Sequence, residues 1–115
     1  MTDKELNNLP PSLRQKSRYL KFRIHSEENI DLGEFVDEVW DQCLDYLGTR
    51  GTSEVNFWII KNQFREKDQK GIIKVKRDKT EDLRAVLGLI NNIEGKKSVI
   101  EVTAVSGSIK QLKDN

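Results

Sequence analysis

The sequence has one cysteine and one histidine, Cys43 and His25, so it lacks the side chains from which most metal and catalytic sites are built. A single cysteine excludes a disulfide within the chain and fits a reducing cytoplasm. One cysteine and one histidine cannot make a zinc site, and no set of nucleophile, base and orienting group can be assembled from the other residues. We therefore expect no catalytic residue, no metal site and no cofactor bound by this chain.

Long apolar runs and prolines are also scarce. No run approaches the roughly 18 residues that a membrane span needs, and the polar residues 1–8 resemble neither a signal peptide nor a transit peptide. The two prolines, Pro10 and Pro11, are adjacent, so no proline-rich linker divides the chain. The sequence predicts a single cytoplasmic domain, 1–115, in which residues 1–9 form a flexible N-terminus and residues 108–115 form a polar tail.

Four segments alternate apolar and polar side chains with the period of two that is typical of a strand with one buried face. They are Ser17–Ser26, Glu54–Asn62, Gly71–Arg77 and Ser98–Val105. Together with two helices, they give the order β-α-β-β-α-β. This order predicts an α+β, ferredoxin-like fold resembling RNA-recognition motifs, with a four-stranded antiparallel sheet and both helices on one face.

The first predicted helix begins after Asp31, which forms a capping-box pattern with Glu34. Its apolar residues recur at helical spacing and include Trp40, as in a helix that packs on a sheet. Gly48, followed by Gly51, is expected to end this helix.

The second predicted helix has Thr80 as its N-cap, and its apolar residues continue to Ile93. Gly95 is expected to end it. Gly88 lies inside the helix, where glycine costs about 1 kcal/mol relative to alanine. We expect Gly88 to allow close approach of the neighbouring helix.

The sheet face away from the helices is predicted to carry cations and a few large apolar side chains. Its expected members are Tyr19, Lys21, Arg23, His25, Trp58, Ile60, Lys74, Lys76, Glu101, Thr103 and Val105. Three uses of this face remain open. It could be a solvated face partly covered by the chain's own termini, a surface covered by a partner protein, or an RNA surface with bases stacked on Trp58 or Tyr19.

The net charge of +1 hides a separation of charge along the chain. Residues 7–25 hold five cations and no carboxylate, residues 26–49 hold eight carboxylates and no Lys or Arg, and residues 61–79 hold eight cations against three carboxylates. A polyanion responds to a local patch within one Debye length, about 8–10 Å. The residues predicted to bind RNA phosphates are Arg14, Lys16, Arg18, Lys21, Arg23, Lys74, Lys76 and Arg77.

Trp58 and Ile60 are predicted to bind a partner protein. Both belong to the sheet face that the predicted helices leave open. Full exposure of a tryptophan forgoes burial worth roughly 2–3 kcal/mol, and aromatic residues are common anchors of protein interfaces.

Several motifs resemble the archaeal family of ribonuclease P protein component 2, a Pop-five-like ribonuclease P subunit family. The similar segments are Leu9–Arg14 (LPPSLR), Arg18–Ile24 (RYLKFRI), Gly33–Trp40 (GEFVDEVW), Gly71–Ile73 (GII), the helix over Leu83–Ile93 and Val105–Lys110 (VSGSIK). They follow in the family's order from about Leu9 to Lys110, and the first and last are the most specific. Ser108 stands where the family pattern has Thr, which keeps a hydroxyl at that position.

The resemblance implies an accessory subunit of an RNA-based enzyme that removes the 5′ leader of precursor tRNA. It further implies pairing with the TIM-barrel ribonuclease P protein component 3, a homodimer within a heterotetramer, and binding to the catalytic domain of ribonuclease P RNA. Mg²⁺ ions held by that RNA would cut the substrate. The alternative is a ferredoxin-like protein-interaction or regulatory module without an RNA role, and a stand-alone hydrolase comes third because it lacks a site.

Overall fold

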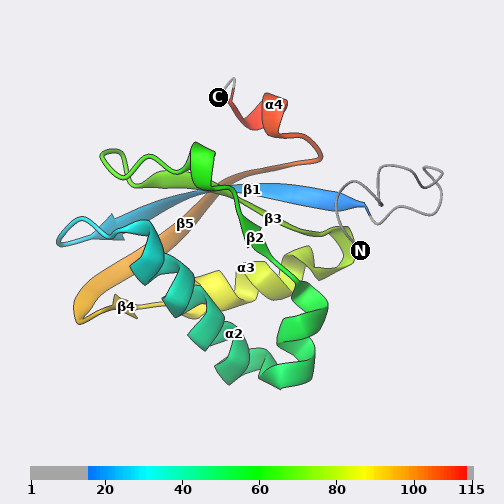
Figure 1. The fold of residues 1–115 in the computed structure, drawn as a ribbon, viewed down its shortest axis with the longest axis horizontal. Helices are drawn as coiled ribbons and strands as arrows, with labels where there is room; N and C mark the ends of the chain where they lie inside the picture. Colours follow the sequence, from blue (N-terminus) through cyan, green and yellow to red (C-terminus); the bar gives the residue numbers. More distant parts are fainter. Residues whose placement is uncertain (1–15, 114–115) are drawn as a thin grey trace.

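The computed structural model describes residues 16–113, in which five antiparallel strands form one sheet with helices on both sides (Figure 1). The strands lie in the order β2-β3-β1-β5-β4. Their bounds are β1 Ser17–Ser26, β2 Trp58–Ile59, β3 Lys70–Lys76, β4 Asn92–Ile93 and β5 Lys96–Ser106. The helices are α2 Leu32–Val55, α3 Thr80–Leu89 and α4 Ile109–Lys113, with short 3-10 helices η2 Lys61–Gln63 and η3 Arg77–Lys79. The prediction of an α+β fold is confirmed, but the sheet has five strands instead of four.

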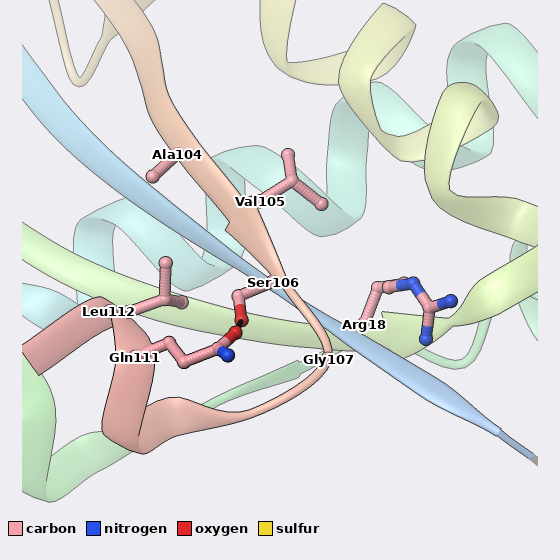
Figure 2. A pocket seen from close by; sticks show the side chains of 7 residues that line it. All are labelled: Arg18, Ala104, Val105, Ser106, Gly107, Gln111 and Leu112. Carbon is pink, nitrogen blue, oxygen red and sulfur yellow. Dashed lines mark hydrogen bonds between the residues drawn. The ribbon is translucent and has the colours of Figure 1, made fainter.

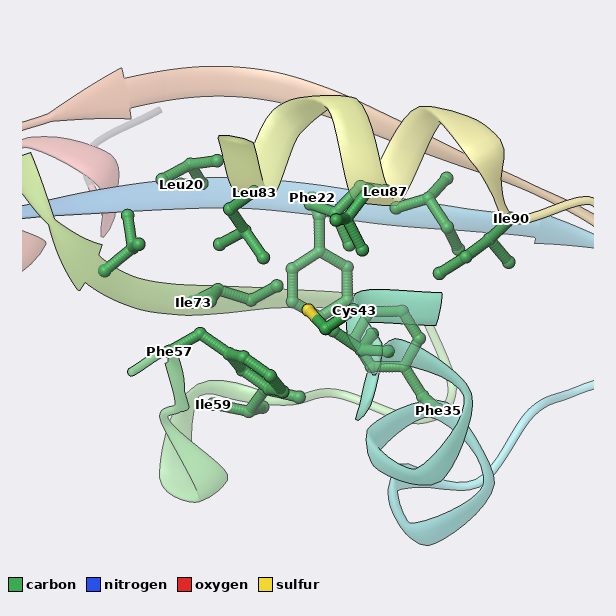
Figure 3. Packing of buried hydrophobic residues seen from close by; sticks show 14 of the residues in the cluster. Leu20, Phe22, Phe35, Cys43, Phe57, Ile59, Ile73, Leu83, Leu87 and Ile90 are labelled. Carbon is green, nitrogen blue, oxygen red and sulfur yellow. The ribbon is translucent and has the colours of Figure 1, made fainter. Parts of the chain in front are cut away.

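Strand β1 is the centre of the sheet, because it pairs with β3 along one side and with β5 along the other. Its alternation is the one predicted: Leu20, Phe22 and Ile24 are buried beneath the helices. The Phe22 ring stacks on Phe35 of α2 at a centroid distance of 4.7 Å, and the Cys43 side chain lies in the same cluster (Figure 3). The period-two pattern of this segment therefore places the core correctly.

A β-bulge in the pairing of β1 with β5 changes which side chains share a face. Phe22 lies opposite Val102, but its neighbour Lys21 lies opposite Ala104, so Thr103 is the extra residue. One extra residue reverses the alternation beyond the bulge. Val105 consequently lies opposite Leu20, on the helix side of the sheet. Its predicted position on the open face is wrong for this reason.

Helix α2 begins as predicted and ends later than predicted. The Asp31 side chain accepts a hydrogen bond from the Glu34 backbone N–H, and the Glu34 side chain accepts one from the Asp31 N–H, which completes the capping box. Gly48 leaves helical geometry (φ 74°), yet the helix resumes and continues to Val55. The Thr52 hydroxyl donates to the Gly48 carbonyl across this kink at 2.7 Å.

The longer α2 shortens the strand that follows it. The predicted strand Glu54–Asn62 begins as the last turn of α2 and Asn56 caps that turn in the left-handed region (φ 46°). Only Trp58–Ile59 pairs with β3. Because β2 is so short and lies at the edge of the sheet, the sheet covers little of α2 on the side next to β2.

Helix α3 is shorter than predicted, and the fifth strand follows it. The helix ends at Leu89, and Ile93 belongs instead to β4, which pairs with β5 around a turn at Glu94 and Gly95. Positive φ values at both turn residues suit a tight hairpin. Thr80 is the first helical residue, and its hydroxyl donates to the Arg77 carbonyl at 2.9 Å, so it does not cap the helix as predicted.

Gly88 does not mediate a close helix contact. Apart from its chain neighbours and the backbone of its own helix, a Cβ added there would have no atom within 4 Å, and the residue is exposed. The predicted close approach is therefore wrong, because Gly88 lies on the solvent side of α3 and the neighbouring helix packs against the other side.

The C-terminal segment covers part of the sheet face opposite α2 and α3 (Figure 1). Within the predicted polar tail, α4 presents a buried Leu112, and the Lys21 ammonium donates to the Leu112 carbonyl at 3.3 Å. Ile72, which is also on this face of the sheet, is buried as well. None of the helices within residues 16–113 is both long and apolar enough to cross a membrane.

Candidate nucleic-acid and partner interfaces

One row of side chains crosses the sheet on the face opposite α2 and α3, which we call the open face. Trp58 lies opposite Lys74, Lys74 lies opposite Tyr19, and Tyr19 lies opposite Ser106. Residues directly opposite each other in antiparallel strands have side chains on the same face, with Cβ atoms about 5 Å apart. In this row Lys74 therefore stands between two aromatic residues, Trp58 and Tyr19.

The structure brings four of the eight predicted RNA-binding cations to the open face: Lys21, Arg23, Lys74 and Lys76. Lys70, which the sequence analysis did not select, lies opposite Arg23 and is exposed. It was missed because the predicted strand began one residue later, at Gly71. The open face thus carries one more cation than expected.

The other four predicted cations do not share that face. Arg18 alternates with Tyr19 and lies on the helix side at the start of β1. Lys16 and Arg77 lie next to each other at the end of the sheet, where the Arg77 N–H donates to the Lys16 carbonyl at 3.0 Å. Arg14 lies outside the described residues. All eight remain predicted phosphate ligands, and the seven described ones are divided between the open face and the end of the sheet.

Carboxylates are nearly absent from the sheet. Glu101 is the only Asp or Glu within the five strands, and it lies opposite Arg23 while its Oε1 contacts His25 Nε2 at 2.8 Å. A phosphate approaching the open face meets cations with one carboxylate among them. This arrangement favours a polyanion.

The carboxylates collect on α2, on the other side of the molecule. Asp37, Asp41 and Asp45 are exposed along this helix. Burial, and then the charges of Asp41 and Glu94, raise the pKa of Glu38 above its ordinary value. The exposed carboxylates of α2 form a surface that would repel RNA, so the charge separation seen along the sequence is also a separation in space.

An apolar groove of about 900 Å³ lies between α2 and the edge strand β2. Its lining residues are Leu32, Gly33, Val36, Asp37, Trp40, Phe57, Trp58, Ile59, Ile60, Lys61 and Asn62. Both predicted partner-binding residues belong to it: Trp58 is 66% exposed, and Ile60 is half-buried. The segment α4 does not cover Trp58, so this side chain is presented to solvent.

Trp40 was expected in the buried stripe of its helix, and this expectation is wrong. The Trp40 side chain is 40% exposed, and its ring lies 4.7 Å from that of Phe57. The two-residue strand β2 leaves α2 uncovered at this point. Trp40 therefore joins Trp58 in the groove, a pairing that no sequence pattern indicated.

Two findings on the described residues concern chemistry by this chain's own side chains. Burial raises the pKa of the Cys43 thiol to about 11, so this cysteine is not a thiolate at neutral pH. Within residues 16–113 no three His, Cys, Asp or Glu side chains lie together as a metal site requires. Cys43 acts as a small buried apolar residue.

Fold and surface together define a class: a small α+β binding protein with a cationic sheet face and an apolar groove at the sheet edge. The family model described as "Rpp14/Pop5 family" matches residues 18–115, and the chain belongs to this family. The family resemblance predicted from the motifs is thereby confirmed.

Curated relatives and one solved structure agree with this assignment. "Ribonuclease P protein component 2" of Pyrococcus furiosus is 42% identical over 105 residues, which cover 91% of this chain and 86% of that protein. The protein of the same name from Methanocaldococcus jannaschii is 36% identical over 94% of this chain and 78% of its own length. A chain of the cryo-EM structure of yeast ribonuclease MRP superposes with a TM-score of 0.66 at 14% identity, covering 82% of this chain and 76% of that chain, and it supports the fold.

Proposed function

We propose that this chain is a protein subunit of ribonuclease P that assists the catalytic RNA in removing the 5′ leader of precursor tRNA. The observation that carries the proposal is the open face, where five Lys and Arg side chains meet a single carboxylate in a member of the Rpp14/Pop5 family. The chain binds RNA phosphates through these cations. The RNA performs the cleavage with its own Mg²⁺, and the complex works in the cytoplasm.

The strand order supports assigning the fold to the ferredoxin-like group. Without the short hairpin strand, the order is β2-β3-β1-β5, and the two long helices lie on one face. Both crossovers then follow the split βαβ pattern. In this interpretation β4 is an addition to a four-stranded core.

The partner of the groove is, in this proposal, the TIM-barrel ribonuclease P protein component 3, and two copies of this chain meet in the centre of a heterotetramer. Two features support a protein ligand at the groove. Trp40 and Trp58 are both exposed there, and Asp37 on its rim would repel phosphate. The groove and the open face meet at Trp58, which lines the groove and also begins the row across the open face. The alternative, a protein-interaction module without an RNA role, does not explain why the open face is cationic.

The first prediction tests phosphate binding at the open face. Replacing Arg23 or Lys74 by Ala should reduce the slope of log K against log salt concentration by 0.7–0.9 for ribonuclease P RNA, because each variant loses roughly one phosphate contact. Sequence preference should hardly change. The matched control is Arg84→Ala, an exposed cation on α3. Binding measured between low and moderate salt gives the slopes, and native slopes in both open-face variants would refute the assignment.

The second prediction tests the groove as the partner site. Trp58→Ala should weaken the complex with component 3 at least 10-fold, since exposed tryptophans that become buried are typical interface hot spots. The melting temperature of the isolated chain should change little, because the side chain is already 66% exposed. Val99→Ala removes another exposed apolar side chain from β5 and serves as the control. Equal affinities for the Trp58 and Val99 variants, measured by calorimetry, would rule the groove out.

A further inference from the structure

A second hollow, of about 600 Å³, lies where β5 ends and the chain turns into α4. Arg18 from β1, Gln111 and Leu112 from α4, and the four residues Ala104–Gly107 line it (Figure 2). We call it the Arg18–Gly107 hollow. Ala104 and Ser106 contribute to it from the open face, and Arg18 and Val105 contribute from the helix side, so it lies at the end of the sheet where β5 ends.

The guanidinium of Arg18 is the only charged group in the lining. Its Nη1 donates to the neighbouring Ser17 carbonyl at 3.0 Å. Among residues 16–113, no Asp or Glu side chain makes an ion pair with it. A half-buried arginine whose guanidinium donates to a neutral carbonyl gains most from an anion, because charge-assisted hydrogen bonds are about twice as strong as neutral ones.

Gly107 leaves space directly beside this guanidinium. A Cβ on Gly107 would lie 3.6 Å from Arg18 Nη1, which is ordinary contact, and its φ lies outside the left-handed region. Neither backbone conformation nor packing therefore requires glycine here, unlike Gly71, where a Cβ would lie 2.7 Å from the Phe22 ring. A side chain at this position would occupy space beside the guanidinium.

The turn around Gly107 is held in place by hydroxyl groups. Ser106 Oγ is hydrogen-bonded to Gln111 Oε1 and accepts from the Ser108 N–H at 3.2 Å. Ser108 Oγ in turn accepts from the Gln111 N–H at 3.4 Å. These hydrogen bonds favour one arrangement of the turn, and such preorganisation lowers the entropic cost of binding a ligand.

The charges around the hollow favour a polyanion over a single carboxylate. Lys16 and Arg77 lie together at the same end of the sheet, and Lys110 is exposed on α4. Residues 104–111 contain no Asp or Glu. A phosphate chain would meet cations on several sides of the bound group.

We propose that the Arg18–Gly107 hollow holds one backbone phosphate of the RNA, with the Arg18 guanidinium as its ligand and Gly107 as the residue that keeps the space open. This inference rests on the proposed RNA-binding function. It adds a defined phosphate position at the end of the sheet, beside the open face, where β5 turns toward α4.

The test compares Arg18→Ala, Gly107→Val and the double variant in binding to ribonuclease P RNA over a range of salt concentrations. Each single variant should bind about 10-fold more weakly, the effect of one charged hydrogen bond, and lose 0.7–0.9 from the salt slope. The double variant should bind no more weakly than Arg18→Ala, because both changes remove the same contact. Gly88→Val, an exposed glycine with no close neighbour, should keep the native slope.

Several outcomes would overturn the proposal. A Gly107→Val protein that melts like the native chain and binds RNA with the native slope would refute it, although the open-face variants Arg23→Ala and Lys74→Ala could still support the proposed function. If Gly107→Val melts early, Gly107→Ala takes its place, since its Cβ fits without displacement. If the native chain itself showed no salt-dependent binding to RNA, both the phosphate site and the proposed RNA-binding function would be refuted.

A titration with inorganic phosphate at constant ionic strength distinguishes RNA from a free ion. The Gly107 amide signal in NMR spectra should shift weakly, with saturation only far above 1 mM, because one ion lacks the neighbouring phosphates. Arg18→Ala should abolish this shift. Tight saturation below 1 mM would indicate a site for free phosphate and overturn the RNA assignment.

Discussion

Replacing Gly71 by alanine should lower the free energy of unfolding by about 1–3 kcal/mol, the usual cost of overpacking a core. A Cβ at this position would lie 2.7 Å from Cζ and 3.0 Å from Cε1 of Phe22, and 3.1 Å from Cδ1 of Phe64. Phe22 cannot move aside easily, because its ring is fully buried and stacks on Phe35 at 4.7 Å. Gly71 is thus required by the close approach of β3 to the core.

The same substitution on α3 should have the opposite sign. Gly88→Ala adds its Cβ to open space, and alanine favours a helix over glycine by about 1 kcal/mol. Urea denaturation followed by circular dichroism measures both changes. In a double-mutant cycle, Phe22→Leu should reduce the cost of Gly71→Ala, since leucine lacks the Cζ atom that the new Cβ would meet. A cycle in which the two costs simply add would show that the ring is not the obstacle.

The core strand and the first helix start could be predicted because their signals are local. Alternation over Ser17–Ser26 reports burial of one face directly, and the capping box of Asp31 with Glu34 involves groups three residues apart. Such patterns predict the position of an element to within a few residues. They also placed Lys21, Arg23 and Lys74 on one face, because this requires only the alternation of side chains between the two faces of each strand.

The features that could not be predicted depend on contacts between distant segments. Gly48 bends α2 without ending it, since Thr52 and the packing of Val55 restore the helix beyond the kink. The bulge at Thr103 has no mark in its own sequence, and it moves Val105 to the other face.

The apolar groove between α2 and β2 depends on distant segments in the same way. Trp40 appears at helical spacing as a core residue. Its exposure follows from the shortness of β2, which is set by where α2 ends. A groove formed by a helix and the following strand edge therefore becomes visible only when both boundaries are known.

The complex of this chain with component 3 should lower the Mg²⁺ concentration at which ribonuclease P RNA cleaves precursor tRNA. An RNA active site is limited by repulsion between phosphates, and each phosphate that a fixed cation neutralises releases a condensed counterion. A protein that binds the active arrangement of the RNA preferentially shifts the population toward it without adding a chemical step. The rate at saturating Mg²⁺ should therefore change much less than the Mg²⁺ midpoint.

Two double variants of equal net charge distinguish an effect of the open-face cations from an effect of the total charge of the protein. Arg23→Ala with Lys74→Ala removes two cations from the open face, while Arg50→Ala with Arg84→Ala removes two exposed cations from α2 and α3. In assemblies with component 3, the first variant should raise the Mg²⁺ midpoint by about twofold or more relative to the native protein.

The second variant should leave that midpoint unchanged, because long-range effects of exposed charges are screened beyond about 10 Å at 0.1 M salt. Equal midpoints for the two variants would mean that net charge, and not the open face, assists the RNA. Cleavage of precursor tRNA by the purified protein without ribonuclease P RNA would contradict the proposal that the RNA is the catalyst, since the protein would then have to supply a catalytic group.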